Sequence, residues 1–161
     1  MKNKRKHGLK QTLDSEKTKI LILGTFPAEE TLASGEYYSN SSNRFWDVIF
    51  SVIKENKPEE YEDKIKILNK HSICLWDLIE SCERVGSLDK DIHNAIKNDF
   101  SSFNNAKIFV NGFSPRKKYK KYGLKESDLD GFVLLPSTSR ANASYNLKKL
   151  IKEWERNIIN D

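Results

Sequence analysis

The sequence is poor in residues that bind metals. It contains two cysteines and three histidines among 161 residues. Two thiolates are too few to ligate an iron–sulfur cluster or to build a cysteine-rich zinc site. The histidines, His7, His71 and His93, are scattered, and no cluster of His, Asp and Glu has ligand spacing. We therefore expect no metal and no cofactor, and we expect Cys74 and Cys82 to be half-buried thiols in a reducing compartment.

Long apolar runs are also missing. No stretch approaches the ~20 apolar residues that cross a bilayer, and the basic start has no apolar segment behind it that would make a signal peptide. We therefore expect a cytoplasmic protein with no membrane partner. At about 100–200 residues per domain the length favours one domain, and 37% hydrophobic residues can form its core. We expect a flexible basic tail over residues 1–16, a single domain over residues 17–161, and a monomer.

The glycine and serine motifs of common nucleotide-binding and hydrolytic sites are absent. The segment after the first apolar run, Gly24-Thr25-Phe26-Pro27-Ala28, lacks both the Gly-x-Gly-x-x-Gly of dinucleotide sites and the Gly-Lys-Ser/Thr of a Walker loop. There is no Gly-x-Ser-x-Gly elbow. Clustered carboxylates that could hold catalytic metals are missing too, which argues against a general nuclease.

Charge is the first positive signal. Lys and Arg exceed Asp and Glu by 28 to 23, a net charge of +5. Part of this excess lies at residues 2–6 and part at residues 116–121. A basic excess suits a polyanionic partner, although each run taken alone is more typical of a solvated or disordered surface.

Apolar runs and helical spacing alternate along the chain. Four runs predict buried strands: residues 19–24, 72–76, 107–112 and 131–136. Helical spacing or cap signals predict helices between them: residues 43–53, 58–70, 89–98 and 114–122, and a last helix with an apolar stripe over residues 147–158. This alternation predicts an α/β fold with a parallel sheet flanked by helices.

Polar and unusual residues gather where the predicted strands end. They are Gly24 to Pro27, Trp76-Asp77, Asn111-Gly112 and Ser137 to Ser139. In open parallel sheets, ligands bind outside the carboxyl ends of the strands. These segments therefore form the expected rim of an active site.

Several of these residues have two interpretations. Phe26 could stack on a planar ring or close the end of the core. Of the adjacent Tyr37 and Tyr38, we expect one to face the pocket. Asn43 stands at the start of a predicted helix, where an amide is most often a cap, although it can also donate and accept hydrogen bonds to a substrate.

The segment from Pro136 to Ala143 packs hydroxyls, an arginine and small residues between a strand and a helix. Hydroxyls and backbone N–H groups there could grip phosphate, and Arg140 could probe a groove. An ordinary capped loop is the alternative.

Three ordered stretches carry a resemblance. They are LILGTFP leading to GEYYSNSSNRFW, then LWDLIESCERVGSLDKDI, then LLPSTSRANA. This order resembles the uracil-DNA glycosylase superfamily and, within it, the hypoxanthine-DNA (DNA-deoxyinosine) glycosylase family, over roughly residues 18–158. The resemblance implies a three-layer sandwich with a central four-stranded parallel sheet between helices. It also implies an enzyme without metal that flips a damaged nucleotide out of DNA and hydrolyses its N-glycosidic bond.

The resemblance also implies a catalytic residue. Many uracil glycosylases carry an Asp or Asn two residues after the first-motif glycine, and here that residue is Phe26. The hypoxanthine family also lacks it, and its important Asn maps onto Asn43. Two departures stand out. Residues 40–42 replace a usual His-Pro pair. Arg140 stands where Pro is more common in the family, and an Arg at this position is similar to the wedge loop of the mismatch-specific enzymes.

The predicted site follows from both lines of reasoning. The catalytic residue is Asn43. The base-binding residues are Gly24, Thr25, Phe26, Pro27, Tyr38 and Asp77, and the DNA-binding residues are Ser137, Thr138, Ser139, Arg140 and Asn142. The predicted function is a monofunctional DNA glycosylase of base excision repair whose partner is DNA containing a deaminated base, hypoxanthine first. The alternatives are a uracil or mismatch-specific glycosylase and a non-catalytic damaged-DNA binder of the same fold.

Overall fold

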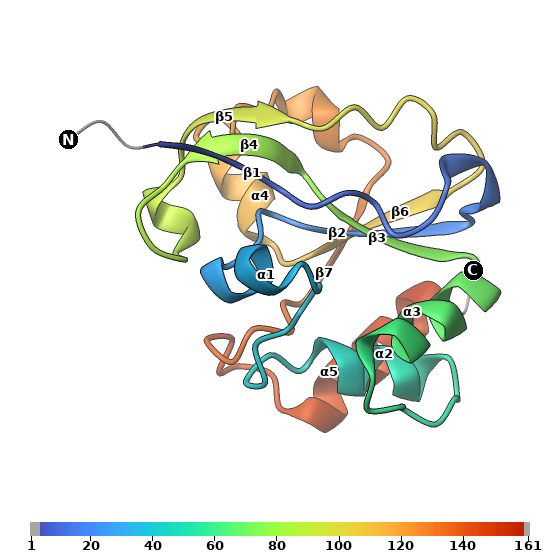
Figure 1. The fold of residues 1–161 in the computed structure, drawn as a ribbon. Helices are drawn as coiled ribbons and strands as arrows, with labels where there is room; N and C mark the ends of the chain where they lie inside the picture. Colours follow the sequence, from blue (N-terminus) through green and yellow to red (C-terminus); the bar gives the residue numbers. More distant parts are fainter. Residues whose placement is uncertain (1–3, 160–161) are drawn as a thin grey trace.

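A four-stranded parallel sheet lies at the centre of the computed structural model, which describes residues 4–159 (Figure 1). Its strand order is β3-β2-β6-β7. The strands are β2 (Ile20–Gly24), β3 (Ile73–Asp77), β6 (Lys107–Asn111) and β7 (Val133–Leu135). Leu21, Ile22 and Leu23 of β2 have no exposed surface, because layers cover both faces of the sheet, and this explains the apolar run of that strand. The sheet confirms the predicted fold class.

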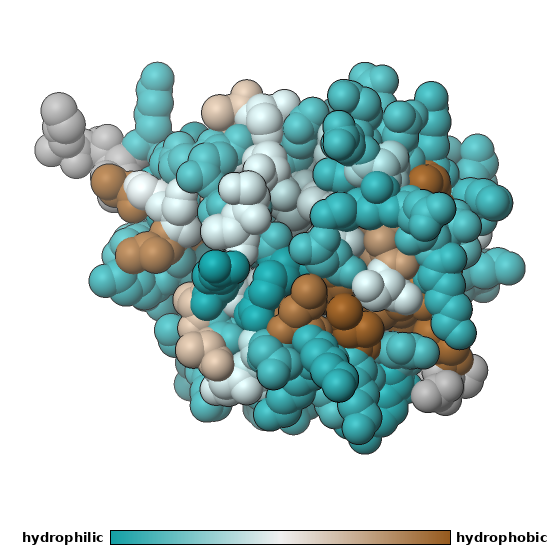
Figure 2. Space-filling model, turned by 90° about the horizontal axis from the view of Figure 1, so that it is seen from below, coloured by the Kyte–Doolittle hydropathy of each residue, from teal (hydrophilic) through white to brown (hydrophobic). Residues whose placement is uncertain are grey.

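Helices cover one face of the sheet. They are α2 (Phe45–Val52), α3 (Tyr61–Lys70) and α5 (Leu147–Ile158), which lie below the sheet in Figure 1. The buried Trp154 of α5 packs edge-on against Phe45 of α2, and its indole donates a hydrogen bond to the carbonyl of Pro136 at 2.9 Å. These contacts tie α5 to the segment that follows β7. Seen from below, the surface is mostly hydrophilic, with a hydrophobic patch near the centre and smaller hydrophobic spots toward the edges (Figure 2).

A second sheet covers part of the other face. It is antiparallel and has the order β1-β4-β5, with β1 (Arg5–His7), β4 (Ile79–Glu83) and β5 (His93–Lys97). The remaining helices are short: α1 (Glu29–Ser34), α4 (Ser114–Lys118), and the 3-10 helices η1 (Ser15–Lys17), η2 (Asp89–Asp91) and η3 (Glu126–Leu129). The apolar core between the two sheets includes Leu21, Leu23, Cys74 and Cys82. Both thiols are therefore fully buried rather than half-buried.

The N-terminal segment corrects one prediction. We expected a flexible tail over residues 1–16, of which residues 1–3 lie outside the described part of the chain. Within the rest, β1 pairs with β4 in the register Lys6 to Cys82, and the Gly8 amide donates to the Glu80 carbonyl at 2.8 Å. Further along, the Thr12 hydroxyl accepts a hydrogen bond from the Leu75 amide at 2.8 Å. The polar composition of the segment hides this role, because its backbone groups pair with the edge of a strand that is distant in the sequence.

The helix predicted over residues 89–98 is also wrong. One turn of η2 is followed by β5, which pairs with β4 through Ile79 and Lys97. β4 lies in a stretch for which the sequence pattern predicted neither a strand nor a helix. Pairing with a neighbouring strand in the tertiary structure overrides the local preference of a short polar run. The other predicted helices exist, but α3 begins at Tyr61 rather than at residue 58, and α4 ends at Lys118.

The carboxyl ends of the parallel strands bring distant segments together. Gly24 at the end of β2 is the register partner of Asp77 at the end of β3, and Asn111 ends the neighbouring β6. Since the chain order reverses on either side of β2, this edge is the switch point at which open α/β sheets bind ligands.

Candidate active site

A cavity of about 430 Å³ opens at this edge of the sheet. It is lined by most of the predicted site residues: Gly24, Thr25, Phe26, Pro27, Tyr38, Asn43, Asp77, Ser137, Thr138 and Ser139. Two predicted DNA-binding residues do not line it, because Arg140 is exposed and Asn142 faces its own loop. The sequence therefore predicted most of the wall of one cavity from four separate segments.

Four neutral polar side chains form a connected wall, which we call the amide wall: Asn43, Thr138, Asn111 and Tyr38. The Thr138 hydroxyl donates to Asn43 Oδ1 at 2.8 Å, and Asn111 Nδ2 donates to Thr138 Oγ1 at 2.9 Å. Asn111 Oδ1 accepts from the Thr138 amide at 3.0 Å, and its Nδ2 lies 3.3 Å from the Tyr38 hydroxyl. Each member is thus oriented by its neighbours.

Asn43 lies directly before Arg44, the N-cap residue of α2, and its side chain bonds both the helix start and the amide wall. Its Oδ1 accepts from the backbone amide of Phe45, in the first turn of α2, at 2.9 Å as well as from Thr138. The Phe45 amide fixes which end of the Asn43 side chain is oxygen, because a backbone N–H can only donate and cannot pair with an NH₂ group. Among the described residues none accepts a hydrogen bond from Asn43 Nδ2, and Asn43 lines the cavity, so this group is available to donate to a ligand there.

The tyrosines differ in what they offer the cavity. Both line it, where we had expected one. The Tyr37 hydroxyl donates to the Lys10 carbonyl at 2.9 Å, whereas Tyr38 stacks on Phe45 at 4.0 Å between ring centroids and turns its hydroxyl toward Asn111. Burial raises the pKa of both phenols, so they stay neutral.

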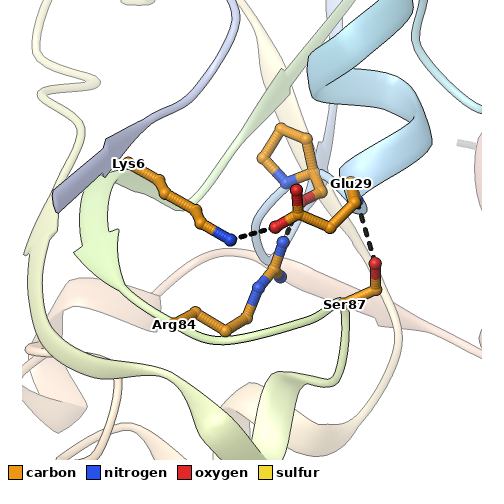
Figure 3. A network of polar contacts seen from close by, with 5 residues as sticks. Lys6, Glu29, Arg84 and Ser87 are labelled. Atoms are coloured by element: carbon orange, nitrogen blue, oxygen red, sulfur yellow. Dashed lines mark hydrogen bonds and ion pairs between the residues drawn. The ribbon is translucent and has the colours of Figure 1, made fainter. Parts of the chain in front are cut away.

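Behind Phe26 lies a buried arginine that sequence reasoning missed. Phe26 is 6% exposed and lines the cavity, and the Arg84 guanidinium lies 5.0 Å from its ring centroid. Arg84 also donates to the Pro27 carbonyl. Figure 3 shows Lys6 reaching toward Glu29 in the same network, in which the Ser87 hydroxyl accepts from the Glu29 amide at 2.9 Å. The turn that carries Phe26 is thus held from behind.

Two carboxyl groups and this arginine make up what we call the acidic floor: Asp77, Asp89 and Arg84. Asp77 is 5% exposed, and burial raises its pKa to about 7, with Asp89 adding to the shift and Arg84 opposing it. Burial also raises the pKa of Asp89, against the effects of Arg84 and of a hydrogen bond with Thr25. Sequence reasoning placed Asp77 here and missed Asp89, which follows the loop after β4.

The loop after β7 is held by an arginine that was also missed. Arg44 Nη2 donates to the carbonyls of Ser139 at 2.8 Å and Asn142 at 3.3 Å, and its Nε lies 3.3 Å from the Thr138 carbonyl. Its Nη1 donates to the Tyr145 carbonyl. One guanidinium therefore fixes the loop to the start of α2. Its position directly beside Asn43 in the sequence was the signal that could have found it.

Loop side chains predicted to contact DNA also brace the loop itself. Asn142 Nδ2 donates to the Ser137 carbonyl at 3.0 Å, and the hydroxyls of Ser137 and Ser139 accept from the amides of Ser139 and Ala141 at 3.1 and 3.2 Å. These bonds shape the loop from within.

Within the described residues, no three His, Cys, Asp or Glu side chains are placed to hold a metal ion. Over the same part of the chain, no helix is both long and apolar enough to span a membrane.

Comparison with known proteins identifies the family. The model of the uracil DNA glycosylase superfamily matches residues 11–161. The chain belongs to the uracil DNA glycosylase superfamily. The resemblance inferred from the three motifs is thereby confirmed.

Two relatives of the chain are both named hypoxanthine DNA glycosylase. A hypoxanthine DNA glycosylase from Methanosarcina acetivorans is 36% identical over 153 residues, covering 93% of this chain and 96% of that protein. One from Methanosarcina barkeri is 33% identical over 98 residues, covering 60% and 61%. The solution NMR structure of a candidate uracil DNA glycosylase from M. acetivorans superposes with a TM-score of 0.74 at 32% identity, covering 94% of this chain and 95% of the other.

Proposed function

We propose that this protein is a monofunctional DNA glycosylase that removes hypoxanthine from DNA by hydrolysis of the N-glycosidic bond, as the first step of base excision repair. The observation that carries the proposal is the fixed amide of Asn43, whose Nδ2 is left to donate into a cavity at the switch point of the sheet. The similarity to proteins named hypoxanthine DNA glycosylase supports the choice of base.

The cavity suits a base that has been flipped out of the duplex. Phe26 provides a flat face, and Asn43 provides a donor for the carbonyl oxygen of the base. As the bond breaks, positive charge develops on the sugar and negative charge on the departing base, so a fixed donor at that oxygen stabilises the transition state more than the ground state.

An amide is not a general base, so the attacking water is not strongly activated by Asn43. The rate therefore depends on how well the base leaves, which favours a deaminated base over adenine or cytosine. A mismatched base is also easier to extrude from the duplex.

DNA is the substrate to be bound, and the net charge of +5 favours its phosphates. The exposed Arg140 and the loop braced by Arg44 lie in the segment that borders the cavity at Ser137 to Ser139. We assign to this loop the contacts beside the lesion, with Arg140 entering the gap left by the flipped base. In this proposal the protein acts as a cytoplasmic monomer.

The test uses labelled duplexes that contain one hypoxanthine, one uracil or no lesion, incubated with the protein in EDTA and then treated with alkali. We expect cleavage of the hypoxanthine strand only after alkali, and uracil measures the breadth of the pocket. Asn43→Ala should lower single-turnover excision by about 10²–10³-fold while duplex binding persists. The exposed, distant Asn105 offers a matched control, Asn105→Ala. The absence of any alkali-sensitive product from folded protein would refute the enzyme and leave a DNA-binding module.

A further inference from the structure

Asp77 is a buried acid that faces the cavity without a full set of partners. It ends β3, lines the cavity and is 5% exposed. Among the residues that the structure describes, none forms a hydrogen bond to its Oδ2. A buried ionised carboxylate without partners is strongly disfavoured, whereas a protonated carboxyl carries an O–H that can donate to a ligand.

The packing around Asp77 holds it in place. A β-carbon at Gly24 would lie 2.6 Å from Asp77 Oδ1, so the carboxyl group occupies the space directly over the glycine. Asn98 Nδ2 donates to the Asp77 carbonyl at 2.8 Å, which fixes the backbone from the other side. The carboxyl group is therefore confined to the base of the cavity.

Charged and titratable groups from several elements face this carboxyl. They are Asp89 of η2, Arg84 after β4, and the neutral phenols of Tyr37 and Tyr38 before α2; Glu30 of α1 lines the same cavity. Asp89 and burial favour the protonated form of Asp77, and Arg84 favours the ionised form. The balance puts its pKa at about 7, where an acid can both hold and release a proton at physiological pH.

We propose that Asp77 is a general acid that protonates N7 of the flipped purine while the glycosidic bond breaks. This assignment rests on the proposed function. N7 lies beside O6 on one edge of hypoxanthine, so a pocket that offers the Asn43 amide to O6 and the Asp77 O–H to N7 reads that edge with two donors. Adenine presents an amino group, itself a donor, at the same place.

The step balances without any further reactant. The bond between C1′ and N9 breaks and its electron pair moves into the purine ring, whose N7 takes the proton of Asp77, so that neutral hypoxanthine leaves. Water adds its oxygen to C1′ of the cationic sugar and loses a proton, which restores Asp77. The products are free hypoxanthine and an abasic sugar. A uracil base has no N7 and gains nothing from this step.

The first measurement is the single-turnover rate of hypoxanthine excision between pH 5.5 and pH 9. The protonated carboxyl is the reacting form. The excision rate should therefore fall about tenfold for each pH unit above the pKa of Asp77. Asp77→Asn should lower the excision rate at pH 6.5 by about 100-fold and remove the fall of the rate at alkaline pH. Asp77→Glu should keep part of the rate and part of this pH dependence. Asp130→Asn, at an exposed position, is the matched control and should change neither.

A substrate change separates acid catalysis from a structural role. In 7-deazahypoxanthine a C–H replaces N7, so the unaltered protein should excise it about 100-fold more slowly than hypoxanthine, and Asp77→Asn should slow it no further. Equal rates for the two bases with the unaltered protein would overturn the assignment even if Asp77→Asn does not fold. The assignment would also be overturned if Asp77→Asn slowed the excision of both bases by the same factor, or if its excision rate still fell at alkaline pH.

The two proposals fail in different ways. If the unaltered protein yields no abasic site from hypoxanthine at any pH, the proposed function fails and takes the role of Asp77 with it. If hypoxanthine is released with a flat pH profile, the glycosylase stands and the role of Asp77 alone is refuted.

Discussion

The two sides of the cavity satisfy their polar groups in opposite ways. In the amide wall, Asn43 Oδ1, Thr138 and Asn111 are bonded to one another at 2.8 to 3.0 Å and all are neutral. In the acidic floor, Asp77 Oδ2 and the Nε and Nη1 of Arg84 are buried without hydrogen-bond partners among the described residues. A satisfied neutral network sets geometry, whereas buried charges held apart from partners set proton affinity. The comparison indicates a division between the two sides of one cavity: the amide wall orients side chains, and the acidic floor sets the proton affinity of Asp77.

The largest effect should come from removing the charge of the floor. The folded-state pKa of Asp77 lies above its ordinary 3.8, so its stabilising contribution is complete below about pH 4 and is lost as pH rises through about 7. Asp77→Asn does not titrate and should be more stable than the unaltered protein at pH 8 by on the order of 3 kcal/mol, with little difference at pH 4. Urea unfolding at both pH values measures this. A difference that does not depend on pH would show that Asp77 is not held protonated.

Gly24→Ala tests how tightly the floor is packed. The new β-carbon would lie 2.6 Å from Asp77 Oδ1, so the carboxyl must move, and we expect a loss of about 1–3 kcal/mol in the free energy of unfolding. Thermal and urea denaturation measure the loss. Truncation in the double variant Gly24→Ala/Asp77→Ala should recover part of it, and an equal loss in both backgrounds would place the clash elsewhere.

Thr138→Val breaks the amide wall while keeping the shape of the side chain. It removes the hydroxyl donor to Asn43 Oδ1, and we expect a loss of about 1–2 kcal/mol in stability and of about tenfold in excision rate, with the pH dependence unchanged. An altered pH limb would mean that wall and floor are not separate. Thr138→Ser keeps the hydroxyl and serves as the matched control.

Arg44→Lys gives the smallest effect and separates the loop from the chemistry. A single ammonium cannot serve carbonyls of four residues, so the loop should loosen, and duplex affinity should fall about three- to tenfold. Single-turnover excision at saturating protein should change by less than twofold. Arg156→Lys on exposed α5 surface is the control. A large loss of rate in the bound complex would place Arg44 among the residues that orient Asn43.

Local pattern was sufficient where burial dominates. The apolar run of β2 and the helical spacing of α2 both appear in the structure, because a strand covered on both faces and a helix with one core face leave strong periodic signals. The strand ends then placed Gly24 and Asp77 at one cavity, since parallel strands share an edge.

Local pattern failed where a partner distant in the sequence decides. The polar residues 5–7 became β1, and residues 93–97 became β5 rather than helix, because both pair with β4. Arg44 and Arg84 were missed for a related reason: their roles depend on carbonyl groups that lie far along the chain, at Ser139 and Pro27.

By itself, then, the sequence determined the parallel sheet, the segments that meet at the edge of this sheet, and the family of the chain. Hydrophobic periodicity and motif order are local properties of the chain. Only the tertiary structure decided which groups bond the Asn43 oxygen and that Asp77 is buried beside Asp89 and Arg84. Hydrogen-bond direction and proton affinity depend on the groups that folding brings within a few ångströms, and those groups come from segments that no local pattern connects.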